Sequence, residues 1–164
     1  MSSLQEIELI LLVGIGATAV LDIWLILFGR LGVPTLNFAF VGRWVGHLRR
    51  GTMVHAGIAR STPIHGELAL GWFTHYAIGI SFAWALLAMQ GISWARQPTL
   101  WPCLLLGVCT VLMPLFVMQP AMGAGFASSK TATPAKNVIR SVANHAVFGL
   151  GLYLSSLLAA QWLR

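Results

Sequence analysis

Two histidines and one aspartate stand inside stretches of the chain that are otherwise apolar. His75 lies in GWFTHYAIG and His145 in NHAVFGLG, and each is followed four residues later by a glycine, Gly79 or Gly149. Residues four apart share one face of a helix, so each imidazole would have open space beside it. Asp22 lies in the apolar segment near the N-terminus. An ionisable side chain within a membrane span costs roughly 2.5 to 3.5 kcal/mol on insertion scales, so it is a functional candidate by default.

These residue types suggest two kinds of ligand site. Two neutral imidazoles on facing helices could be the axial ligands of a haem b, with glycine leaving room for the flat macrocycle. Arg43 or Arg140 would then bind the haem propionates. Alternatively, Asp22 and Glu67 could join the two histidines in a site for a divalent transition metal, or in the proton relay of a carrier, because histidine and carboxylate suit zinc, iron or manganese.

A third interpretation needs no ligand. Polar side chains can hydrogen-bond across membrane helices whose small residues allow close packing. The protein would then be an accessory or structural membrane subunit. Hydrolytic enzyme chemistry is disfavoured, since no Ser or Cys nucleophile is visibly paired with a base and neither HExxH nor CxxC occurs.

Composition places these residues in a bilayer. The 164-residue chain is 57% hydrophobic and only 9% charged, with a mean hydropathy of +0.80, which one soluble core cannot accommodate. Apolar runs long enough to cross about 30 Å of hydrocarbon lie at about 7–28, 68–89, 100–117 and 138–162. Backbone groups in lipid must be satisfied within the segment, so these spans are helices. We therefore predict an all-α, integral membrane four-helix bundle in a single domain.

The first predicted loop contains an amphipathic segment at about 37–50, NFAFVGRWVGHLRR. Its apolar residues recur at helical spacing: Val41, Trp44, Val45 and Leu48. Arg43, His47 and Arg50 fall on the opposite side. This pattern predicts a helix lying in the plane of the lipid headgroups, with its charged face directed away from the apolar stripe.

Two proline positions suggest where helices begin. Thr62 precedes Pro63 and Thr133 precedes Pro134, and each pair combines an N-cap residue with proline at the first helical position. We therefore expect the second and fourth spans to start at these sites.

The distribution of basic residues predicts the topology. One side of the membrane would carry eight of the ten Lys and Arg residues: Arg30, Arg43, Arg49, Arg50, Arg60, Lys130, Lys136 and Arg140. The other side would carry only Arg96 and Arg164. The positive-inside rule then places both termini in the periplasm. The net charge of +6 indicates contact with anionic lipid headgroups rather than nucleic acid.

With this topology, the three ionisable residues share one level of the membrane. Asp22, His75 and His145 would each lie about 8 to 10 Å below the cytoplasmic boundary, at 1.5 Å of rise per residue. They could meet in one layer that opens toward the cytoplasm. A bundle this small would need a homo-oligomer or a larger membrane complex to build a transport pathway.

Four segments carry a family resemblance: VGRWVGHLRRG, HGELALGWFTHYAIG, VLMPLFVMQPAMGAG and NHAVFGLGLY. Together they resemble an uncharacterised family of small bacterial inner-membrane proteins, a domain of unknown function, over nearly the whole chain. The resemblance implies four transmembrane helices in the bacterial plasma membrane. It implies no established activity and supplies no catalytic residues.

Overall fold

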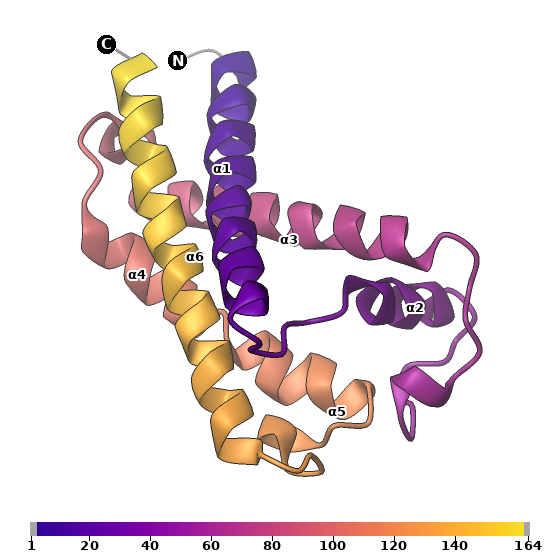
Figure 1. Cartoon of the computed structure of the whole chain (residues 1–164). Coiled ribbons are helices and arrows are strands. Elements are labelled where there is room, and N and C mark those ends of the chain that lie inside the picture. The colour runs from indigo at the N-terminus through magenta and orange to yellow at the C-terminus, as the bar shows by residue number, and fades with distance from the viewer. Residues whose placement is uncertain (1–2, 163–164) are drawn as a thin grey trace. The chain divides into compact units, whose positions relative to one another are not determined.

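The computed structural model describes residues 3–162, and every regular element within that range is helical. The α-helices are labelled in Figure 1. Their bounds are α1 Ser3–Arg30, α2 Phe38–Leu48, α3 Glu67–Gln90, α4 Leu100–Cys109, α5 Gln119–Ala121 and α6 Pro134–Trp162. Short 3-10 turns lie at Ile58–Arg60, Ile92–Arg96 and Phe126–Ser128. The all-α prediction is confirmed for this range, whereas Arg164, assigned to the periplasmic side, lies outside the described residues.

Four helical stretches are long and apolar enough to cross a membrane: Ser3–Arg30, Glu67–Gln90, Leu100–Ala121 and Pro134–Gln161. They coincide with the four predicted spans. Insertion into a bilayer and the arrangement of the spans as a four-helix bundle stay predictions. Helix α2 occupies most of the segment expected to form the interfacial helix.

Only one of the two predicted helix starts is confirmed. Pro134 is the first residue of α6, and the carbonyl of Thr133 accepts a hydrogen bond from the amide of Asn137. The prediction for Thr62 and Pro63 is wrong, because α3 begins at Glu67. Gly66 just before it has a φ of +73° and forms a turn, which glycine adopts without steric cost.

The third span contains a π-helical turn. Residues Pro114–Met118 form this turn between α4 and α5, and the amide of Gln119 donates to the carbonyl of Pro114. Proline has no amide hydrogen and cannot complete an α-helical bond, so its position favours a local change of helix type. The helical stretch nevertheless continues to Ala121, beyond the predicted end at 117.

The chain divides into two compact units. The first contains residues 1–34, 76–109 and 144–164, and the second contains 35–75 and 110–143. Helices α3 and α6 contribute residues to both units. Each unit is described by itself below.

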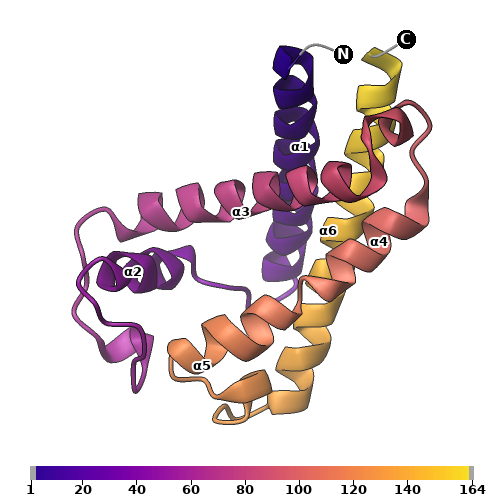
Figure 2. The same cartoon turned by 180° about the vertical axis from the view of Figure 1, so that it is seen from behind.

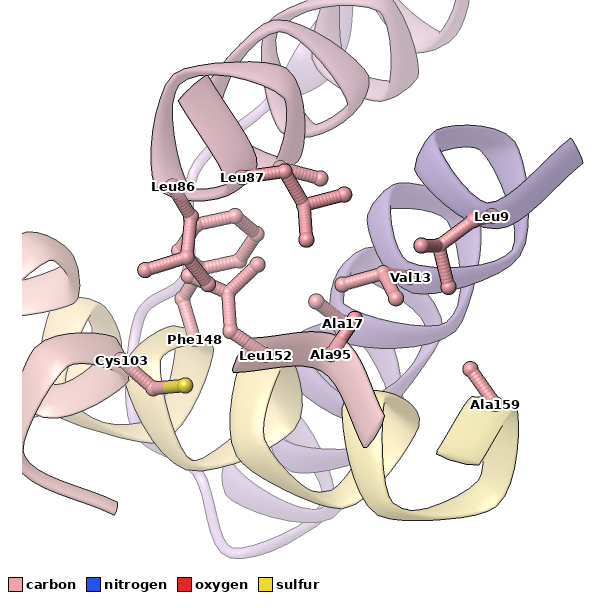
Figure 3. Close-up of a cluster of buried hydrophobic side chains, with 11 residues drawn as sticks. Leu9, Val13, Ala17, Leu86, Leu87, Ala95, Cys103, Phe148, Leu152 and Ala159 are labelled. Carbon is pink, nitrogen blue, oxygen red and sulfur yellow. The ribbon is translucent and has the colours of Figure 1, made fainter. Parts of the chain in front are cut away.

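The hydrophobic core of the first unit joins α1, α3, α4 and α6. In this unit α1 and the later part of α6 lie side by side (Figures 1 and 2). Figure 3 shows the buried side chains that fill the space between the helices. They are Leu9, Val13, Ala17, Ala83, Leu86, Leu87, Ala95, Cys103, Phe148, Leu152 and Ala159.

Glycines bring the helix backbones of this unit into direct contact. A Cβ atom on Gly107 of α4 would lie 2.5 Å from the Cα of Gly149 on α6. A Cβ on Gly14 of α1 would lie 2.5 Å from the Cα of Ile80 on α3. No side chain fits at either position without moving a helix, so both crossings depend on glycine.

Substitution of Gly107 by alanine tests the α4–α6 crossing. Alanine normally stabilises a helix relative to glycine, but here its methyl group would force the two backbones apart. We expect Gly107→Ala to lower the free energy of unfolding by roughly 1 to 3 kcal/mol, measured by SDS titration of the purified protein in mixed micelles. Gly29→Ala is the matched control, since nothing lies within 4 Å of its added Cβ. Equal effects of the two substitutions would contradict the close crossing.

Candidate functional site

Asp22, the first member of the predicted site, binds a tyrosine. In the first unit the hydroxyl of Tyr76 on α3 donates to Oδ2 of Asp22 on α1 at 2.8 Å. Both side chains are half-buried. The carboxylate that we considered as a metal ligand therefore connects two helices.

The part of α6 around His145 also connects to neighbouring helices. Trp24 of α1 donates its indole N–H to the side-chain oxygen of Asn144 at 3.0 Å. The backbone carbonyl of His145 lies against Gly107 of α4, 2.7 Å from the position of an added Cβ. His145 itself is half-buried in the first unit.

Protein fills the space beside the two glycines that were predicted to leave room for a haem. A Cβ on Gly79 would collide with the hydroxyl oxygen of Thr18 on α1. A Cβ on Gly149 would lie 2.8 Å from the carbonyl oxygen of Cys103 on α4. The space beside each glycine is thus filled by a neighbouring helix, and the prediction that it accommodates a macrocycle finds no support.

His75, Glu67, Arg43 and Arg140 belong to the second unit. The ring of His75 packs against Phe38, with centroids 4.5 Å apart, and meets Trp72 edge-on at 5.9 Å. Arg140 is half-buried on α6. Across the described residues, no group of three or more His, Cys, Asp or Glu side chains is arranged to hold a metal ion. The metal prediction is unsupported, and a common site for these residues stays a prediction.

The second unit contains an ion pair whose arginine is buried and whose glutamate is half-buried. Arg43 of α2 binds Glu67 of α3 through two parallel hydrogen bonds, Nε to Oε2 at 2.8 Å and Nη2 to Oε1 at 2.7 Å. Its Nη1 donates to the carbonyls of Ile58 and Ser61, both at 3.1 Å. Only 7% of Arg43 is exposed. The hydrogen bond to Glu67 raises the pKa of Arg43, although burial opposes that shift.

Two residues of α2 that were expected on its exposed side are buried. Arg43 and His47 were predicted on the outward polar side, but both are buried together with Phe38, Val41 and Gly42. Burial of a guanidinium is tolerable only when its donors are matched, and a carboxylate and loop carbonyls match them here. The spacing of apolar residues shows which face of a helix is hydrophobic. It does not show whether the charged face has a partner within the protein.

Glycines set the distance between α2 and α3. A Cβ on Gly42 would collide with the carbonyl oxygen of Glu67, and one on Gly71 would collide with that of Phe38. The backbones therefore touch, which brings Arg43 within reach of Glu67. The available sequence signal was the spacing of Gly42 and Gly46, a GxxxG pattern typical of close helix packing in membranes.

A pair of histidines lies next to the ion pair. Nδ1 of His47, near the end of α2, is 2.8 Å from Nε2 of His55 in the following loop. His47 is only 8% exposed, and Nδ1 of His55 is buried without a hydrogen-bond partner. The backbone amide of His55 donates to the carbonyl of Ala121 at 2.8 Å. Sequence reasoning did not consider His55, although Gly51 between the two histidines indicated a turn that would bring them together.

The distance between these nitrogens favours a proton bridge over a metal ion. Zinc binds imidazole nitrogen at about 2.0 to 2.1 Å, which would separate two tetrahedral ligands by about 3.3 Å. The observed separation of 2.8 Å is typical of an N–H···N hydrogen bond. The second unit therefore contains a fixed charge pair and a pair of titratable groups that can share one proton.

The profile of one protein family, described as "Protein of unknown function (DUF2938)", matches residues 11–159. The chain belongs to the DUF2938 family. This confirms the predicted membership of an uncharacterised family. No curated protein and no solved structure matches the chain. Both the ion pair and the histidine pair lie within the segment that defines the DUF2938 match.

The ion pair of this DUF2938 protein should be more costly to break than to remove. We expect Glu67→Leu to lower the free energy of unfolding by about 3 to 5 kcal/mol, because it leaves Arg43 buried without its carboxylate. The double variant Arg43→Met with Glu67→Leu should be less destabilised than this single variant. SDS titration in mixed micelles measures both. Lys136→Gln, at an exposed position of the same unit, is the control. If the double variant loses as much free energy of unfolding as Glu67→Leu and Arg43→Met lose together as single variants, the pairing is contradicted.

Proposed function

We propose that this DUF2938 chain is an accessory or structural protein of the bacterial inner membrane. In this proposal its intramembrane polar residues hold helices together and bind no cofactor. The observation that carries the proposal is the hydrogen bond between Tyr76 and Asp22. It engages Asp22, the ionisable residue within the apolar stretch of α1, with a neighbouring helix.

Other polar groups of the first unit are used in the same way. Trp24 of α1 and Asn144 of α6 connect these two helices through a hydrogen bond of 3.0 Å. Unsatisfied polar groups are costly in hydrocarbon, so such bonds resist separation of the helices. Together with the glycine crossings, they support a role in which the bundle provides a rigid membrane-embedded body for a partner.

The exposure of the basic residues in the loops supports the proposed topology, in which the cytoplasmic side carries most of the positive charge. Five of the basic residues assigned to that side are exposed in the second unit: Arg49, Arg50, Arg60, Lys130 and Lys136. Exposed Lys and Arg near a membrane attract anionic headgroups, each by about 1 kcal/mol. We infer that these residues contact anionic lipid and that both termini are periplasmic.

The alternatives have less support. A haem b site requires space beside Gly79 and Gly149, and a helix occupies that space in each case. A divalent metal site or a metal-coupled carrier requires converging ligands, and no group of three or more His, Cys, Asp or Glu side chains arranged to hold a metal occurs among the described residues. A proton-coupled carrier stays an alternative. A homo-oligomer or a larger complex is compatible with the structural role, since a rigid body of this kind would act through its partners.

Absorption spectroscopy and elemental analysis distinguish these functions. We expect protein purified after haem-supplemented expression to be colourless, because helices fill the space proposed for a haem. We also expect it to lack a stoichiometric transition metal, because no group of ligand residues arranged to hold a metal ion occurs among the described residues. A Soret band lost in His75→Ala would overturn the proposal in favour of a redox protein. A stoichiometric metal lost in Asp22→Ala would overturn it in favour of a metal site. His65→Ala, at an exposed histidine, is the control for non-specific binding.

A double-mutant cycle tests the structural role of Asp22. We expect Asp22→Leu and Tyr76→Phe each to destabilise the protein, and the double variant to lose less than the sum of the two. The coupling should be of the order of 0.6 to 1.7 kcal/mol, as for interhelical hydrogen bonds in other membrane proteins, measured by SDS titration. Ser81→Ala is the control for Tyr76→Phe, because the Ser81 hydroxyl bonds only within α3, to Ala77. Additive losses for Asp22 and Tyr76 would show that their contact does not stabilise the fold.

A further inference from the structure

The histidine pair holds the end of α2 to the loop that follows it. His47 lies on the last turn of α2, and His55 lies eight residues further along the chain. The loop is also bonded through its backbone, since the amide of Thr52 donates to the carbonyl of His47 at 3.1 Å. The amide of His55 reaches Ala121. The contact between the two rings therefore influences both the loop and the segment around residue 121.

While the two rings stay in contact, the pair cannot bind a further proton without leaving an N–H group unsatisfied. We assign the neutral pair the tautomers in which Nε2 of His55 donates to Nδ1 of His47, because the buried Nδ1 of His55 then carries a lone pair rather than a hydrogen without an acceptor. A protonated pair that keeps this contact must carry a hydrogen on Nδ1 of His55. That nitrogen is buried and has no acceptor. If the hydrogen is instead placed on Nδ1 of His47, two N–H groups oppose each other across 2.8 Å.

The charges around the histidine pair include those of Arg43 and Glu67. Arg43 lies one turn before His47 on α2, and Glu67 at the start of α3 interacts electrostatically with His47. These two charges are hydrogen-bonded to each other. The segment 119–123, which receives the amide of His55, contains no titratable residue. In the loop itself, the charged or titratable residues Arg49, Arg50, Arg60 and His65 are exposed to solvent.

We propose that His47 and His55 form a proton-sensitive latch that closes the loop after α2 at neutral pH and releases it on acidification. The open loop exposes both imidazoles to water, where each can bind a proton. The open state thus binds more protons than the closed state, so a fall in pH favours opening. The imidazole side chain is the ordinary group that changes charge in this pH range.

Release should be confined to one part of the loop. The carbonyls of Ile58, Ala59 and Ser61 accept hydrogen bonds from Arg43, whose charge is independent of pH in this range. The amide of Ile58 also donates to the carbonyl of Met122 at 2.9 Å. Acid should therefore free residues 50–57 while residues 58–61 stay bound to Arg43.

Hydrogen exchange of the full-length protein in detergent micelles tests the latch. Exchange is measured by mass spectrometry at about pH 8 and about pH 5, after correction for the intrinsic pH dependence of amide exchange. We expect protection of the amides of Thr52 and His55 to fall by about tenfold at the lower pH, as for the loss of one part-buried hydrogen bond. Protection of Ile58 should change little.

Three variants make the interpretation specific. The double variant His47→Asn with His55→Gln keeps amide groups near the two facing nitrogens but cannot titrate, so its loop should stay protected at both pH values. His55→Leu should leave the loop unprotected at both. His65→Gln, which changes the exposed histidine of the same loop, should respond like the unaltered protein. Equal protection at both pH values in the unaltered protein would overturn the proposal, as would a full pH response in the Asn–Gln double variant.

Discussion

The organisation of the second unit depends on the ion pair between Arg43 and Glu67. A guanidinium that is 7% exposed would be strongly destabilising without partners, and here it is matched by a carboxylate and by loop carbonyls. The pair joins the middle of α2 to the start of α3 and fixes the loop between them. Glu67 also accepts the amide of Ile64 at 3.0 Å, so the same carboxylate completes the turn that leads into α3. The interaction thus ties α2, the start of α3 and residues 58–61 of the loop to one another.

The first unit uses polar groups differently. Its contacts between helices rely on glycine and on single hydrogen bonds, such as those of Asp22 and Asn144. These bonds join helices without pairing two oppositely charged side chains, which suits the more apolar first unit. A charged pair supported by several carbonyls suits the less apolar second unit. The two units thus solve the same problem, burial of polar atoms, with different residue types.

Apolar length alone was sufficient to predict the helical class and the four candidate spans, because lipid leaves helices as the only backbone solution for such runs. The segment of α2 was also predictable from its spacing. Its orientation was not, since hydrophobic periodicity does not register that Glu67, far along the chain, neutralises Arg43. The start of α3 was missed because Thr62 and Pro63 fit a general capping pattern, whereas the local turn at Gly66 determined the boundary.

The candidate site shows the same division between residue type and environment. His75, His145 and Asp22 were selected because ionisable groups are rare in membrane spans, but that rule does not say which partner each one has. Gly79 and Gly149 resemble space for a ligand in sequence and are contact points between helices in the structure. His55 was overlooked because a loop histidine carries no signal until a turn brings it next to another one, here His47 of α2.

The π-helical turn in the third span affects how its sequence should be read. Such a turn holds one residue more than the α-helical turn that it replaces, so everything after it is rotated by about 100° around the helix axis. A helical wheel drawn straight through Pro114 would therefore assign the residues beyond Met118 to the wrong face. The segments before Pro114 and after Met118 therefore each need a helical wheel of their own.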